Sequence, residues 1–175
     1  MTWSRWAAGQ HGTDLHAHGE HVVAFYVLDG ELTVVFGPAP QTLDAAAGTY
    51  VAIPPGVQHG FSGGRSGVGT WLNLHAPDAG FAGYLRGLRD GTRAAFDMVD
   101  APADGGLPAD RVLVAGPGEG EPVAVDARSG LVKGAGPGLR VVEWDGEPPR
   151  GDGELVAAWA LGDGRVLGVH VDART

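Results

Sequence analysis

The chain has 175 residues, a net charge of −9 and no cysteine. This length is enough for one good-sized core, or for one core with a small second unit. The absence of cysteine excludes disulfides and thiolate metal sites, and an acidic chain without a basic patch is not expected to bind nucleic acid. Because no apolar run is long enough to span a membrane and no signal-peptide pattern opens the chain, we expect a cytoplasmic protein without a membrane partner.

Short apolar runs separated by glycine and proline predict a chain of short strands. Five such runs lie in the first half, at residues 3–8, 21–28, 31–36, 49–53 and 69–75. Asp29-Gly30 separates the second run from the third, and this dipeptide favours a tight hairpin turn because glycine accepts positive φ. Pro54-Pro55-Gly56 ends the fourth run, and Pro77 ends the fifth.

The pattern changes from strand to helix in residues 78–90. Four apolar side chains recur there at helical spacing: Phe81, Tyr84, Leu85 and Leu88. Asp78 is placed to cap this helix and Gly91 to end it. We expect the helix to pack on the outside of the preceding sheet.

The second half of the chain differs in composition. Eleven of the thirteen aromatic residues precede position 101, so the main core is expected in the first half. We predict a β-barrel with its short helix at 1–98, a Pro/Gly-rich linker at 99–121 and a small β unit at 122–175. Residues 162–164 are predicted to form a hairpin turn between the last two strands.

Three histidines are candidate metal ligands. His16 and His18 are two residues apart, so on a strand they face the same side. His59 follows the Pro-Pro-Gly turn, where a bend can direct it back into the sheet. Three neutral imidazoles can hold one divalent ion of Fe, Mn, Ni, Zn or Cu and leave positions open for a substrate. A histidine-rich surface without a metal is the alternative interpretation.

Two segments around these histidines resemble the two motifs of the cupin superfamily. The first is "HAHGEHVVAFYVLDG", which matches at His16, His18 and Gly30. Val23 stands where the family has a glutamate ligand. The second is "GTYVAIPPGVQHGFSG", which matches at four positions: Gly48, Pro54, Gly56 and His59. Gly63 replaces the asparagine that closes this motif.

The resemblance covers roughly residues 3–76, and it is greatest to the quercetin-dioxygenase-like cupins in "AFYVLDGEL" and "LNLHAP". It implies an all-β fold, a small antiparallel jelly-roll barrel, with one short helix here. It also implies a divalent metal in the barrel mouth, held by His16, His18 and His59. The second half has no such histidine pair, so it is either a decayed second cupin or a β-extension.

The missing glutamate leaves three alternatives. The site is a three-histidine metal site, Glu20 replaces the glutamate as a fourth ligand, or the metal is lost and a binding pocket remains. We expect Val23 to occupy the glutamate position. Glu20 should point into water, because it precedes the bend that the odd spacing after His18 requires.

Other residues are weaker candidates. Five side chains are predicted to line the pocket, with an ordinary core role as the alternative: Tyr26, Tyr50, Phe61, Trp71 and His75. His21 is expected to be solvated, His11 to flank the barrel mouth, and His170 to have no functional role.

These features predict a metal-dependent enzyme of the dioxygenase type that acts on a small enol-, catechol- or flavonol-like molecule. The alternatives are a non-redox lyase, isomerase or cyclase, and a non-catalytic cupin that binds a small molecule. The acidic chain with short exposed strands is also expected to form a homodimer, the commonest closed oligomer.

Overall fold

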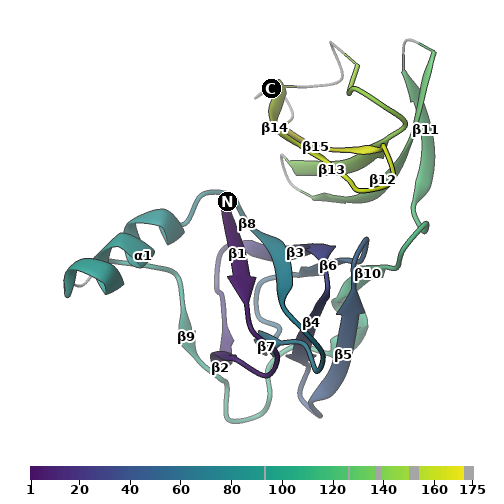
Figure 1. Ribbon diagram of the computed structural model, residues 1–175. Helices are drawn as coiled ribbons and strands as arrows, with labels where there is room; N and C mark the ends of the chain where they lie inside the picture. Colours follow the sequence, from purple (N-terminus) through teal and green to yellow (C-terminus); the bar gives the residue numbers. More distant parts are fainter. Residues whose placement is uncertain (93, 126, 137–138, 150–153, 172–175) are drawn as a thin grey trace. The chain divides into compact units, whose positions relative to one another are not determined.

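The computed structural model describes residues 1–92, 94–125, 127–136, 139–149 and 154–171. It divides into two compact units, Met1–Val114 and Ala115–Thr175 (Figure 1). Both units are built from antiparallel sheets, and α1 (Phe81–Asp90) is the one α-helix among the described residues. The predicted all-β jelly-roll class is therefore confirmed. No helix in the described ranges is long and apolar enough to cross a membrane.

Two five-stranded sheets form the first unit. One has, in spatial order, β1 (Thr2–Trp6), β8 (Gly69–Ala76), β3 (Val22–Asp29), β6 (Tyr50–Ile53) and β10 (Leu113–Ala115). The other has β5 (Gln41–Ala46), β4 (Glu31–Phe36), β7 (His59–Gly63), β2 (His11–Ala17) and β9 (Val99–Asp100). Apart from the hairpin of β4 and β5, neighbouring strands in these sheets are distant in sequence, which brings residues from both ends of the unit together.

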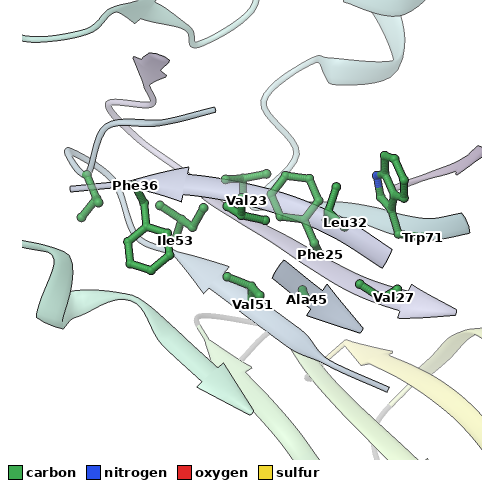
Figure 2. Close-up of a cluster of buried hydrophobic side chains, with 11 residues drawn as sticks. Val23, Phe25, Val27, Leu32, Phe36, Ala45, Val51, Ile53 and Trp71 are labelled. Carbon is green, nitrogen blue, oxygen red and sulfur yellow. The ribbon is translucent and has the colours of Figure 1, made fainter. Parts of the chain in front are cut away.

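The core of the first unit comes from alternating residues on these strands. On β3, Val23, Phe25 and Val27 belong to one buried cluster. Figure 2 shows these three side chains together with those of Leu32 and Trp71. Alternate side chains of a strand point to opposite faces, so Tyr26 on β3 faces away from this cluster although it is 1% exposed.

The turn at Asp29-Gly30 is present, but the predicted hairpin is wrong. Gly30 has the expected positive φ of 67°. However, β3 pairs with β6 and β8 in one sheet, whereas β4 pairs with β5 and β7 in the other. A shift in register between Val27 and Asp29 bends β3 before the turn. The tight turn therefore carries the chain from one sheet to the other.

Helix α1 begins later than predicted. Asp78 does not cap it; its Oδ1 accepts a hydrogen bond from the Gly80 N–H at 3.0 Å in the turn that precedes the helix. The helix ends at Gly91 as expected, with φ of 67°. After the helix the chain returns along β2, where Val99 pairs with Ala17 and Asp100 with His16 (Figure 1).

The segment predicted as a linker, residues 99–121, contains more structure than expected. It holds β9, the short 3₁₀ helix Ala109–Arg111 and β10. A bridge between Val57 and Gly106 also ties it to the first unit. Residues 99–114 therefore belong to the first unit.

The second unit is a single five-stranded sheet. Its order is β11 (Glu121–Val125), β12 (Arg128–Gly136), β13 (Leu139–Trp144), β15 (Val166–Val171) and β14 (Glu154–Ala160). The predicted hairpin at 162–164 is confirmed, because β14 and β15 pair antiparallel and Gly164 has a φ of 88°. Buried apolar side chains include Val141, Trp144 and Leu167.

Candidate metal centre

His16, His18 and His59 lie together at one end of the barrel. His16 on β2 is the direct cross-strand partner of His59 on β7. The ring centroids are 4.4 Å apart for His16 and His59, 4.9 Å for His16 and His18, and 5.0 Å for His18 and His59. One ring nitrogen from each lies within 4.8 Å of the others. His16 and His18 of the first motif and His59 of the second motif therefore form one histidine cluster.

The hydrogen bonds of this cluster fix which nitrogen is free. The Nδ1 of His16 lies 2.8 Å from the Asp14 carbonyl oxygen, that of His18 2.5 Å from Asp97, and that of His59 3.1 Å from Val57. A carbonyl oxygen only accepts, so each Nδ1 carries the hydrogen and each Nε2 keeps its lone pair. Histidine ligands of metals are held in this way by their second nitrogen.

Burial keeps the three rings neutral. It is the largest cause that lowers the pKa of His59 to about 3 and that of His18 to about 4, and it also lowers the pKa of His16. Neighbouring histidines lower these pKa values further. Neutral imidazoles at neutral pH are the form that binds a metal without first losing a proton. The residues present thus fit a divalent ion held by three Nε2 atoms.

Val23 lines the cavity, whereas Glu20 is exposed. Val23 is 1% exposed, pairs with Ile53 and His75 on the neighbouring strands, and lines the same cavity as His18. Glu20 is exposed and belongs to neither histidine cluster found among the described residues. The cluster is therefore made of neutral donors.

Asp97 also belongs to this site, although no pattern in the sequence marks it. Its side chain accepts hydrogen bonds from the backbone N–H groups of Gly19 at 2.9 Å and Glu20 at 2.7 Å. Its Oδ2 also lies 2.8 Å from the Nδ1 of His21. Burial alone would raise the pKa of Asp97, but these hydrogen bonds outweigh it and hold the pKa below its ordinary value. Asp97 therefore fixes the loop that carries His18.

The expectation that His21 is solvated is wrong. His21 is 1% exposed, and both of its ring nitrogens have partners in the protein. Its Nε2 lies 2.8 Å from the Nδ1 of His75 on β8. The bend at Gly19 and Glu20, which Asp97 holds, turns His21 inward beside His18. His18, His21 and His75 form a second cluster of three nearby nitrogens.

A cavity of about 330 Å³ opens beside the histidines. Phe61 and His75 are among the residues that line it, whereas Tyr26, Tyr50 and Trp71 are not. Tyr26 faces the other side of its sheet, and Trp71 is packed in the core below. His11 does not line the cavity either, and 70% of its side chain is exposed.

One wall of the cavity is aromatic and comes from α1 and the segment after it. The wall residues are Phe81, Tyr84, Leu85, Leu88, Phe96 and Met98. Phe81 stacks on His75 with ring centroids 4.0 Å apart, and Phe96 lies 5.3 Å from His18. The helix was predicted to pack on the outside of the sheet, but its apolar side chains line the cavity instead. The spacing of the apolar residues predicted the helix, but it did not predict that these side chains would line the cavity.

Several buried polar atoms at the cavity have no partner among the described residues. They are Thr2 Oγ1, Thr13 Oγ1, Asn73 Oδ1 and His75 Nε2, and all four residues line the cavity. A buried polar atom without a hydrogen bond costs about 1–3 kcal/mol. Such atoms commonly mark places where a ligand, an ion or water is bound.

Comparison with known families agrees with this geometry. Residues 2–74 match the model of the cupin domain, so the first unit contains a cupin domain over these residues. The match includes both histidine motifs and ends before α1, so the aromatic wall and Asp97 lie outside it. The narrower quercetin-dioxygenase-like subtype stays a prediction. Among curated proteins, none matches this chain significantly.

The chain is also similar to solved structures. The crystal structure of protein Ylba from E. coli is 13% identical, with a TM-score of 0.50, and the match covers 97% of this chain and 68% of that one. Oxalate decarboxylase from Bacillus subtilis is 12% identical, with a TM-score of 0.43, over 96% of this chain and 58% of that one. At this identity the first likeness shows the fold alone.

Proposed function

We propose that this cupin is a metal-dependent enzyme of the dioxygenase type that acts on a small enol- or catechol-like molecule. One observation carries the proposal: three histidines, of which His18 and His59 are buried and His16 is half-buried, each keep an Nε2 lone pair directed by a hydrogen-bonded Nδ1, beside a cavity of about 330 Å³. A cluster that served only the core would have no need of three aligned lone pairs.

The charge of the cavity favours an anionic substrate. No Asp, Glu, Lys or Arg is among the described residues that line it. Three neutral ligands leave the full charge of a divalent ion in place, where a family glutamate would have cancelled part of it. Since the cavity wall supplies no cation of its own, an enolate or catecholate would be bound through the ion.

The shape of the cavity favours a small planar substrate. Its volume lies at the lower end of the roughly 300–1,000 Å³ typical of small-molecule sites. Phe61, Phe81 and Phe96 give it aromatic faces, and Asn73 and Thr13 add neutral polar groups. These residues bind and orient a ring, and they exclude water from it.

A bound divalent ion would lower the pKa of a substrate hydroxyl and, if redox-active, would allow electron transfer to dioxygen. The roles of this chain's own residues are separate from that chemistry. His16, His18 and His59 would hold the ion through their Nε2 atoms, and the aromatic wall would bind the substrate in the cavity beside it.

Metal analysis and oxygen consumption together test the proposal. The chain is purified without a histidine tag, its metal content is measured, and oxygen uptake is followed with catechol and with small β-diketones that enolise. We expect about one equivalent of a divalent metal and uptake that depends on it. His59→Ala should lose both, and His11→Ala, which changes an exposed histidine on the same unit, should lose neither.

The outcomes separate the alternatives. Metal without oxygen uptake, but with conversion of the same substrates under nitrogen, would indicate a non-redox lyase, isomerase or cyclase. Metal-free protein that still binds the substrates would indicate a non-catalytic cupin and would refute the proposal.

A further inference from the structure

Asp97, His21 and His75 form a chain of hydrogen bonds that ends at the cavity. The Asp97 Oδ2 lies 2.8 Å from the His21 Nδ1, and the His21 Nε2 lies 2.8 Å from the His75 Nδ1. The His75 Nε2 has no partner among the described residues, and His75 lines the cavity. We call these three residues the relay.

The first hydrogen bond of the relay has a fixed direction. The Asp97 carboxylate is ionised, so it only accepts, and the His21 Nδ1 must donate. In the second hydrogen bond, between the His21 Nε2 and the His75 Nδ1, the donor is the ring that carries the hydrogen. When His75 donates, its Nε2 is left as a lone pair, an acceptor at the cavity wall.

The position of His75 places this acceptor beside the candidate metal site. His75 is the direct cross-strand neighbour of Val23, which occupies the glutamate position of the first motif. Its ring lies 5.7 Å from that of His18 between centroids, and it stacks against Phe81 at 4.0 Å. The hydrogen bond to His21 and the stacking on Phe81 hold the ring on two sides, so its orientation is fixed without a ligand.

A second metal site at His18, His21 and His75 is the competing interpretation of the same residues. It is disfavoured because both nitrogens of His21 and the Nδ1 of His75 are already hydrogen-bonded. The two clusters also share His18, whose one free nitrogen serves a single ion.

We infer that the relay makes His75 Nε2 a hydrogen-bond acceptor for a ligand hydroxyl next to the metal. The ligand class is a planar hydroxylated ring or enol, and the inference in this respect rests on the proposed function. His75 is the ligand-binding residue, and His21 and Asp97 are positioning residues. The Nε2 is covered by protein in the structure, and a side-chain adjustment of the kind common on binding admits the hydroxyl.

The hydrogen positions of the relay can be tested without any metal. The full chain, freed of metal and labelled with ¹⁵N in its histidines, is studied by NMR of the imidazole nitrogens, with His75→Phe used to assign the His75 signals. We expect the hydrogen of both His21 and His75 on Nδ1. A hydrogen on the Nε2 of His75 would overturn the inference, whatever the protein does with metals.

The ligand part is tested by selectivity. Zinc is used as a redox-inert ion, and the affinities for catechol and for its monomethyl ether guaiacol are measured by calorimetry. The ratio of the two should fall by about 3–10-fold in His75→Phe, which is the usual effect of one lost hydrogen bond. It should fall in part in Asp97→Asn, which keeps the ring but loosens it, and stay unchanged in His11→Gln.

Two results would contradict the inference at this stage. An unchanged ratio in His75→Phe would show that Nε2 accepts nothing from the hydroxyl. Loss of zinc in His75→Phe would show that His75 is a metal ligand. If the wild-type chain binds no zinc, the proposed function fails. The ratio of the catechol and guaiacol affinities, measured on the metal-free protein, then tests the acceptor role of His75 independently.

Discussion

The two units of this chain use buried polar residues in opposite ways. In the first unit, His16, His18, His59 and His75 line a cavity, and the buried His75 Nε2 has no partner among the described residues around it. In the second unit, buried Glu143 lies between Lys133 at 3.4 Å and Arg165, which also hydrogen-bonds to it. His170 accepts a hydrogen bond from the Trp144 Nε1 at 3.2 Å.

The difference indicates which unit carries the chemistry. Polar groups that satisfy one another stabilise a sheet but leave nothing to offer a ligand. Polar groups left open cost free energy, and a protein retains them where a ligand repays that cost. Both units are built from five-stranded antiparallel sheets. The contrast in their buried polar groups therefore lies in a few side chains and not in the type of secondary structure.

Removing a ligand of the first cluster should have the largest effect on this contrast. His18→Ala takes away one of three neutral donors, so metal affinity should fall by more than about 100-fold, beyond the 10–100-fold typical of outer-shell losses. His170→Ala removes a buried histidine of the second unit and should leave metal affinity unchanged. Chelator competition measures both. Equal losses in the two variants would contradict the division of roles.

Removing Glu143 should destabilise the second unit alone. Glu143→Leu leaves the fully buried Lys133 ammonium without its carboxylate, a change that typically costs about 3–5 kcal/mol. The exposed partner of Arg165 provides the control, because Asp163→Asn should leave the stability of the second unit almost unchanged. Hydrogen exchange should show the loss in residues 115–171 and no change in the metal content of the first unit.

The stability of the metal-free first unit should fall in acid. Burial lowers the pKa of His59 to about 3 and that of His75 to about 2, from an ordinary 6.5. Below pH 6.5 the unfolded chain therefore binds protons that the folded chain does not. Each of these histidines should cost about 1.4 kcal/mol per pH unit between pH 6 and pH 4.

Denaturant unfolding at several pH values measures this slope. His75→Phe removes one of the two protons and should flatten the slope by about 1.4 kcal/mol per pH unit. A slope that is the same in His75→Phe and the wild type would mean that His75 is not held neutral by the fold.

The smallest effect is expected for Glu20. Because its side chain is exposed, Glu20→Gln should change metal affinity by less than about 2-fold, within the range of ordinary surface changes. Val23→Glu, at the glutamate position, should keep or tighten the metal. If Glu20→Gln strips the metal, the carboxylate is a ligand and the neutral three-histidine site is wrong.

Much of the first cluster could be predicted because its members are marked locally. His16 and His18 share a strand face, and His59 follows a proline-glycine turn that any reader can see. The relay could not be predicted, since Asp97 contacts residues 76 to 79 positions away. No periodic pattern in the sequence connects Asp97, which follows the helix, with the bend at Gly19 and Glu20 before β3. The same limit explains the hairpin error at Gly30, because a turn residue does not reveal which strand its neighbour will pair with.

The hold of Asp97 on residues 18–21 also has a consequence for how the site assembles during synthesis. Chains are made from the N-terminus, so the three motif histidines leave the ribosome well before residue 97. Until then the Nδ1 of His18 lacks its acceptor, and β2 lacks β9 along its edge. The emerging barrel therefore holds its histidines in a loose arrangement, and they become a defined ligand set only after the helix and the segment beyond it have been made.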